Sequence, residues 1–190
     1  MLSISNRYSQ LQPKVMFGEK KKFPSGVHIR WMIRRDMPEV MRTERASFEH
    51  AWTEDDFLRC LRQRNCIGMV AEENDVVAGF MIYELHKTRL NVLNFAVHPG
   101  VRRMGVGGML VAKLIYKLVS HHRQKITLAV RERNLAAQMF FRSQGFIATK
   151  LLRNYYEDSG EDAYLMEYRA PDYSELDDPR ALVNRISKYV

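Results

Sequence analysis

The stretch from Asn91 to Gly108 constrains this chain more than any other. Its apolar run from Val92 to Val97 favours an extended strand. The triplet His98-Pro99-Gly100 then ends that strand, because proline cannot donate to a strand ladder and glycine favours a turn. A glycine-rich run over 102–108 follows and leads into an apolar helix. Such a turn exposes unpaired backbone N–H groups at the positive end of a helix, which suits a pyrophosphate.

Three phosphate-binding motifs compete for this run. A P-loop would need Lys and Ser or Thr after its last glycine, and neither is present. A dinucleotide-binding fingerprint would need a third glycine where Leu110 stands. The remaining pattern is Arg-x-x-Gly-x-Gly, at Arg102, Gly105 and Gly107. A plain strand-to-helix turn accounts for the same residues, so this run alone does not decide the chemistry.

Length and composition exclude several classes of protein. A chain of 190 residues fits one domain, and no apolar run is long enough to span a bilayer. The first residues lack a secretory signal, so we expect a cytoplasmic protein with no membrane partner. The spacing of Cys60 and Cys66 matches no common zinc motif, and we expect no metal. The net charge is +8, but the basic residues are spread along the chain without a nucleic-acid-binding signature, so no direct nucleic-acid partner is expected.

Periodicity predicts the order of elements. We expect a basic N-terminal extension over 1–26, one domain over 27–170 and a polar C-terminal tail over 171–190, with a short helix near its end. The predicted order in the domain is strand, two helices, three strands, helix, strand, helix and two strands. This order implies an α/β or α+β fold with a sheet covered on both faces. Its elements are a strand over 28–34, helices capped by Asp36 and Thr53, strands over 66–71, 76–85 and 92–97, a helix over 110–119, a strand over 126–130, a helix from Asn134, and strands over 147–156 and 163–169.

Two further signatures make the interpretation specific. The segment 131–146 contains an Asn, small residues, aromatics and then Gly-Phe. The segment 153–166 begins Arg-Asn-Tyr-Tyr, continues with Glu161-Asp162-Ala163 and ends in Met166. Together with the glycine-rich run and with Glu44 through Trp52-Thr53-Glu54, these residues resemble the GNAT superfamily of N-acetyltransferases. Within it they are similar to the bacterial ribosomal-protein-alanine N-acetyltransferases of the RimI type.

The resemblance implies a mixed, mostly antiparallel sheet in which two central parallel strands splay apart, with acetyl-CoA as the co-substrate. It implies transfer to an amine, first of all the N-terminal α-amine of a protein such as a ribosomal protein. It places the cofactor on a strand edge, the glycine-rich loop and the predicted helix that begins at Asn134. The residues are Phe95, Ala96, Val97, Arg102, Arg103, Met104, Gly105, Val106, Gly107, Gly108, Asn134 and Phe141. It places the acceptor peptide near Glu44, Trp52, Tyr155 and Tyr156. The sequence does not indicate an oligomeric state.

Several of these residues and their neighbours also have a purely structural explanation. A helix cap accounts for Asn134, and core packing accounts for Phe140 or Phe141. Solvation of a helix end accounts for Glu44, Glu49, His50 and Trp52. In a strand, Tyr155 and Tyr156 point to opposite faces, so one of them would pack internally.

The chain departs from the family at two catalytic positions. Ala129 stands where the relatives carry a glutamate base, and Phe141 stands where they carry a tyrosine acid; neither side chain transfers protons. Either the base has moved to Glu49, His50 or Glu84 with help from Tyr155 or Tyr156, or positioning alone suffices, or the chain binds acetyl-CoA without catalysis. Besides N-terminal acetylation, acetylation of a lysine or small-molecule amine and a non-catalytic acyl-CoA-binding module therefore stay open.

Overall fold

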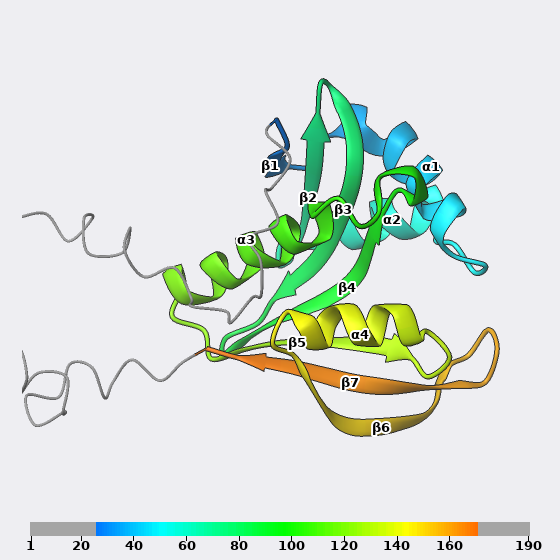
Figure 1. The fold of residues 1–190 in the computed structure, drawn as a ribbon, viewed down its shortest axis with the longest axis vertical. Helices are drawn as coiled ribbons and strands as arrows, with labels where there is room; N and C mark the ends of the chain where they lie inside the picture. The colour runs from blue at the N-terminus through cyan, green and yellow to red at the C-terminus, as the bar shows by residue number, and fades with distance from the viewer. Residues whose placement is uncertain (1–25, 171–190) are drawn as a thin grey trace, which may run out of the picture.

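Seven strands form one sheet in the order β1-β2-β3-β4-β5-β7-β6 in a computed structural model, which describes residues 26–170 (Figure 1). All neighbouring strands are antiparallel except β4 and β5, which are parallel. The strands are β1 His28–Trp31, β2 Cys66–Glu73, β3 Val76–Leu85, β4 Arg89–Val97, β5 Lys125–Arg131, β6 Ile147–Tyr156 and β7 Glu161–Arg169.

Helices cover both faces of this sheet, as predicted. Their bounds are α1 Met37–Ser47, α2 Glu54–Leu61, α3 Val106–Ser120 and α4 Leu135–Ser143, with short 3₁₀ helices η2 Arg34–Asp36 and η3 Pro99–Val101. On one face, α1 and α2 bury Val40, Met41 and Phe57 against the sheet. On the other face, α3 and α4 bury residues such as Leu114 and Phe141. The sheet therefore separates two hydrophobic cores.

Local sequence signals explain several element boundaries. Helix α2 begins with a capping box, in which the Thr53 hydroxyl accepts from the backbone N–H of Asp56 and the Asp56 carboxylate accepts from that of Thr53. The hairpin between β2 and β3 turns at Asn74 and Asp75, whose φ angles are 50° and 63°. Positive φ at both central residues is typical of the tight turn that matches strand twist.

Asp36 is the N-cap residue of α1, as predicted, with a proline in the first turn. Its side chain makes no cap hydrogen bond to α1 and instead takes two bonds from the Arg30 guanidinium, at 2.6 and 2.8 Å. The same guanidinium binds Glu72 on β2 at 2.7 and 2.8 Å. A fork of this kind outcompetes a single cap bond. The first strand is also shorter than predicted, ending at Trp31 before η2 begins at Arg34.

A bulge in β4 shapes the centre of the sheet. Val92 pairs with Tyr83 of β3 and Asn94 pairs with Ile82, which leaves Leu93 as an extra residue. An extra residue bends its strand and increases the local twist. The pairing between β4 and β5 stops at the same level, with Val92 opposite Leu128. The bulge therefore marks the point at which the two parallel strands part.

The predicted extension and tail lie largely outside the description. Residues 1–25 and 171–190, including the predicted C-terminal helix, fall outside the described residues. Within 26–170, no helix is long and apolar enough to cross a membrane. The same residues hold no cluster of His, Cys, Asp and Glu that could ligate a metal.

Candidate active site

The parallel strands β4 and β5 pair over only four residues each, Arg89 to Val92 against Lys125 to Leu128. Beyond that level they diverge, as Figure 1 shows, while β4 continues to Val97. On the side facing β5, the last five residues of β4 therefore have no strand partner among the described residues. Such an edge offers backbone hydrogen bonds to an extended ligand that carries amide groups. The edge includes all three strand residues predicted to bind the cofactor, Phe95, Ala96 and Val97.

The glycine-rich loop lies directly beyond this edge and forms an anion-binding helix start. Gly105 is the N-cap of α3 with φ 93°, and no side chain caps the helix there. The first helical bond runs from the N–H of Met109 to the carbonyl of Gly105, and no residue within 26–170 pairs with the N–H groups of Val106, Gly107 and Gly108. Arg103 also has a positive φ, 67°, which costs a non-glycine residue energy and is common at ligand-binding loops. The geometry fits a phosphate group.

Close packing explains why one of these positions needs glycine. A Cβ at Gly107 would lie 3.1 Å from Phe140 Cζ and 3.3 Å from Phe95 Cζ. A Cβ at Gly108 would meet nothing nearer than Gln144 Oε1 at 3.7 Å. Gly107 thus brings the start of α3 close to the aromatic side chains of β4 and α4.

The three long side chains of the loop that were predicted to bind the cofactor, Arg102, Arg103 and Met104, point in different directions. Arg102 turns back toward α1, where its guanidinium donates to the Val97 carbonyl and to the Ser47 hydroxyl, both at 3.1 Å. Arg103 and Met104 are exposed. In this arrangement Arg102 fixes the end of β4, and the side chain of Arg103 is available to solvent or ligand.

Asn134 and the aromatic pair that follows border the opening from α4. The Asn134 side-chain oxygen accepts from the N–H of Ala137 at 3.0 Å, so it caps α4, while its amide nitrogen remains a donor. Phe140 stacks on Phe95 with ring centres 5.6 Å apart. Phe141 is buried between Phe95, Phe140 and Phe146. Both structural explanations, the cap and core packing, are therefore realised beside the splayed strands.

On the opposite face of the sheet, Glu44 ties three elements together. Its carboxylate accepts from the backbone N–H of Trp52 at 2.8 Å and from the Asn94 side-chain nitrogen at 3.2 Å. The residue is 1% exposed. Burial raises the pKa of Glu44, and these two hydrogen bonds oppose the rise only in part. Glu44 thereby anchors the loop between α1 and α2 on β4, next to the bulge.

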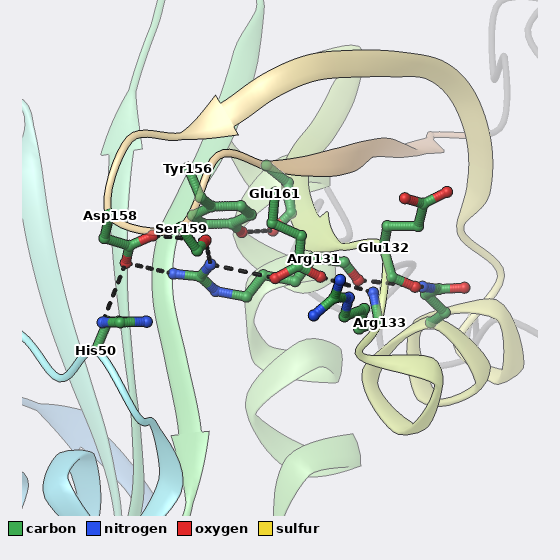
Figure 2. Close-up of polar contacts among 10 residues, drawn as sticks. His50, Arg131, Glu132, Arg133, Tyr156, Asp158, Ser159 and Glu161 are labelled. Carbon is green, nitrogen blue, oxygen red and sulfur yellow. Dashed lines mark hydrogen bonds and ion pairs between the residues drawn. The ribbon is translucent and has the colours of Figure 1, made fainter.

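Arg131, at the end of β5, organises the other wall of this face, as Figure 2 shows. Its guanidinium lies 3.8 Å from the centre of the Tyr156 ring and binds Asp158 at 2.6 Å and Glu161 at 3.3 Å. The hydrogen bond from Arg131 holds the pKa of Asp158 below its usual range. From the α1–α2 loop, His50 Nδ1 approaches the same Asp158 carboxylate to 3.8 Å. These contacts join the α1–α2 loop to the turn between β6 and β7.

The two tyrosines of β6 take different roles, but they do not point to opposite faces as strand alternation predicts, because β6 is irregular after Leu152 and the two rings meet edge-on. The Tyr156 hydroxyl donates to the Ala129 carbonyl at 3.3 Å, and burial raises the pKa of Tyr156 to about 12, although Arg131 opposes this. Tyr155 is half exposed and meets the Tyr156 ring edge-on at 5.1 Å.

The base candidates do not all meet at this face. Glu49 and His50 lie in the α1–α2 loop and are exposed. Glu84 lies opposite Asn91, at the level where β4 and β5 are still paired, and binds His86 and Asn91. The structure therefore brings His50 to the network of Arg131 and leaves Glu84 at the closed end of the sheet. Sequence reasoning assigned no role to Asn94, Arg131, Asp158 or Glu161, although Arg131 and Glu161 lie within the two segments that carry the resemblance.

Comparison with known proteins decides the family. A family model described as the acetyltransferase (GNAT) family matches residues 30–146, more than half of the chain. The chain belongs to the GNAT family. The predicted fold, the predicted enzyme class of N-acetyltransferase and acetyl-CoA as the co-substrate are confirmed with it.

Two sequence relatives of this GNAT protein and one solved structure describe its neighbourhood. The ribosomal protein bS18-alanine N-acetyltransferase of Escherichia coli (strain K12) is 30% identical over 133 residues, 69% of this chain and 89% of that protein. An N-alpha-acetyltransferase of Sulfurisphaera tokodaii is 28% identical over 144 residues, 69% of this chain and 86% of that protein. The crystal structure of the ribosomal-protein-S18-alanine N-acetyltransferase from Escherichia coli matches with a TM-score of 0.69 and 28% identity, covering 75% of this chain and 93% of that one.

Proposed function

We propose that this GNAT protein acetylates the N-terminal α-amine of a protein in the cytoplasm, a ribosomal protein being the first acceptor to test. The support is the acceptor-side wall, in which the α1–α2 loop and the β6–β7 turn meet at His50 and Asp158. The relatives named for bS18 alanine and for N-alpha-acetylation point the same way.

The proton chemistry of the site favours an α-amine over a lysine. Ala129 and Phe141 carry no proton-transfer group, and Phe141 is buried among other aromatics. At pH 7.4, about a quarter of N-terminal amines are neutral, against about one lysine in a thousand. An acceptor that arrives largely neutral needs little help from a base, and a lysine would need a great deal.

On the cofactor side, backbone atoms would carry most of the binding. The free edge of β4 from Phe95 to Val97 would bind the pantetheine amides of acetyl-CoA, and the Asn134 amide nitrogen would add a side-chain donor. The N–H groups of Val106 to Gly108 would hold the pyrophosphate, with Arg103 supplying charge. Phe95, Phe140 and Phe141 would form the apolar wall beside the thioester, which supplies the acetyl group.

On the acceptor side, His50 is the favoured proton acceptor. Histidine is the most frequent general base, and Asp158 lies 3.8 Å from its Nδ1. Because Arg131 lowers the pKa of Asp158, that carboxylate stays ionised and orients the imidazole. The exposed ring of Tyr155 would contact the peptide, whereas Tyr156, anchored on Ala129, would position Arg131. Glu44 and Trp52 would set the loop, and Glu49 is the second candidate base.

The test uses one peptide that offers both amines. A short peptide beginning in alanine and containing one lysine is incubated with acetyl-CoA, and mass spectrometry locates the acetyl group. We expect acetylation at the α-amine only and no thiol release with the N-terminally blocked peptide. Acetylated lysine would favour the alternative acceptor. Acetyl-CoA binding without transfer to this peptide or to a panel of free amines would favour a non-catalytic module.

Two variants test the assignment of the base. We expect His50→Ala to lower kcat at pH 6.5 by about 10²-fold, a typical contribution of a general base, and to matter less at pH 9, where the amine is already neutral. Glu49→Gln, which removes the second candidate base, should change kcat less than twofold if His50 is the base. Equal rates for His50→Ala and the wild type at pH 6.5 would remove His50 from this role.

A further inference from the structure

The end of the sheet opposite the glycine-rich loop gathers cations from four separate segments. There β3 and β7 end and β4 and β5 begin (Figure 1). Backbone bonds join the segments: Leu85 donates to Asn65, Gln124 to Thr88 and Ala170 to Gln124, at 2.7 to 2.9 Å. We call this surface the basic end and define it by Arg64, Lys87, Arg89, Arg123, Lys125 and Arg169.

Strand register brings three of these cations into one row. Arg89 of β4 is opposite Lys125 of β5, which is opposite Arg169 of β7. Neighbouring strands lie only about 4.8 Å apart, and like charges directly opposite each other destabilise a sheet. Such a row needs an anion, and among residues 26–170 no carboxylate pairs with Arg89, its outer member.

Internal carboxylates compensate the basic end only in part. Glu167 binds Lys125 at 2.9 Å and Arg169 at 3.4 Å. Glu84 is engaged by His86 and Asn91. Within residues 26–170, Arg64, Lys87 and Arg89 make no ion pair, and all three are exposed. The uncompensated charge therefore faces solvent.

The chemistry of the surface indicates its partner. Four of the six cations are arginines, whose planar fork matches phosphate oxygens. The segments that hold the six cations carry no large exposed hydrophobic side chain, although Ile147 lies opposite Glu167 at the start of the neighbouring strand; a membrane-binding surface combines cations with several apolar side chains. We propose that the basic end binds the phosphodiester backbone of RNA without sequence preference. RNA is chosen over DNA because the proposed acceptor is a ribosomal protein, so this choice rests on the proposed function.

The proposal revises the expectation drawn from the sequence. The basic residues are indeed spread along the chain, but the fold brings six of them, from positions 64 to 169, to one end of the sheet. The basic end is also remote from the glycine-rich loop, so RNA bound at the basic end would not displace acetyl-CoA from the loop.

The test measures fluorescence anisotropy of an end-labelled, unstructured 20-nucleotide RNA with the full chain. The full chain retains the acidic residues that follow β7 in the sequence, namely Asp172, Glu175, Asp177 and Asp178. We expect the double variant Lys87→Glu/Arg89→Glu to bind at least tenfold more weakly. Because this variant would neutralise two fewer phosphates, the slope of log affinity against log salt should shrink by about 1.4.

The matched control is Arg42→Glu/Arg45→Glu, the same charge change on two exposed residues of α1. It should keep RNA affinity within about threefold when the salt concentration is the same. Acetylation of a short peptide should be unchanged in Lys87→Glu/Arg89→Glu, and Lys87→Gln/Arg89→Gln replaces it if the reversal impairs folding. Absence of RNA binding, equal losses in both double variants, or binding to phosphatidylserine vesicles in place of RNA would overturn the proposal. Because RNA binding is measured without acetyl transfer, its failure is distinct from failure of the proposed function.

Discussion

Arg131 holds its guanidinium 3.8 Å from the centre of the Tyr156 ring. The contact is a cation–π pair, and the same guanidinium forms ion pairs with the carboxylates of Asp158 and Glu161. One side chain thereby fixes the end of β5, the last residue of β6 and the turn that reaches His50. The acceptor wall of the site depends on it.

Replacing Arg131 should therefore weaken acceptor binding selectively. We expect Arg131→Met to raise KM for the acceptor peptide about tenfold, or about 1.4 kcal/mol, while KM for acetyl-CoA changes less than twofold. Steady-state kinetics with each substrate varied in turn measures both. Arg153→Met is the matched control. Arg153 forms an ion pair with Asp162 within the β6–β7 hairpin, but its side chain is largely exposed, and exposed ion pairs contribute little to stability. Parallel loss in both KM values would contradict a role confined to the acceptor wall.

Glu44 should make stability depend on pH in a defined direction. Burial raises the pKa of Glu44 in the folded state, so its contribution to stability is fully present below the unfolded-state pKa and is lost as pH rises through the folded-state pKa. The wild type should therefore gain stability relative to Glu44→Gln when the pH falls from 7.5 to 4.5. Urea unfolding of both proteins at the two pH values measures the difference, and an unchanged difference would contradict the buried titration.

Truncating Glu44 to alanine should lower the free energy of unfolding by more than Glu44→Gln does. In Glu44→Ala, the N–H of Trp52 and the side chain of Asn94 lose their acceptor. An unsatisfied buried group costs about 1–3 kcal/mol, and we expect a loss of that order in the free energy of unfolding at pH 7.5. Thr43→Ala, at the adjacent buried position of α1, shows how much of the loss reflects packing alone.

Two neighbouring glycines of the loop should respond differently to a methyl group. Gly107→Ala places a Cβ 3.1 Å from Phe140 and 3.3 Å from Phe95, so the rings must shift. We expect KM for acetyl-CoA to rise about tenfold, a change of about 1.4 kcal/mol. Gly108→Ala has space for its methyl group and should leave KM within twofold. Isothermal titration with CoA gives the same comparison without turnover, and equal affinities would show that the ring contacts do not position the loop.

A carboxylate introduced at position 129, where the relatives carry a glutamate base, should show whether a general base limits kcat. Alternation along β5 puts this side chain on the same face as Arg131, whose charge would keep a new glutamate ionised. We expect Ala129→Glu to raise kcat at pH 6.5 about tenfold, less than the 10² to 10⁴ of an evolved base, and to have little effect at pH 9. Ala129→Gln should do neither. A pH-independent change would indicate altered packing instead.

The features that the sequence predicted depend on residues close together in the chain. The capping box of Thr53 and Asp56, the turn at Asn74 and Asp75 and the glycine at position 105 each act within a few residues. Asp36 shows the limit of such reasoning: it is the N-cap residue of α1, but its carboxylate binds the Arg30 guanidinium and makes no cap hydrogen bond, which no capping rule includes.

The parts of the site that the sequence did not reveal depend on contacts across the fold. Glu44 and Asn94 are 50 residues apart and meet only because α1 packs on β4 beside a bulge. Nothing marks Leu93 as the extra residue, since the run from Val92 to Val97 has the composition of an uninterrupted strand. Arg131 and Asp158 meet because β5 and the β6–β7 hairpin are neighbours in the sheet.

The short paired region between β4 and β5, called the seam here, has a consequence for the stability of the folded protein. Four paired residues on each strand join two halves of the sheet, and the open edge beyond Val92 is where acetyl-CoA would add its own row of hydrogen bonds. The co-substrate would then serve as a missing strand, and a ligand at 100 times its dissociation constant stabilises a fold by about 2.7 kcal/mol. Protein without bound acetyl-CoA or CoA would lack this contribution at the seam, so the supply of the cofactor would affect how long the folded enzyme persists as well as how fast it works.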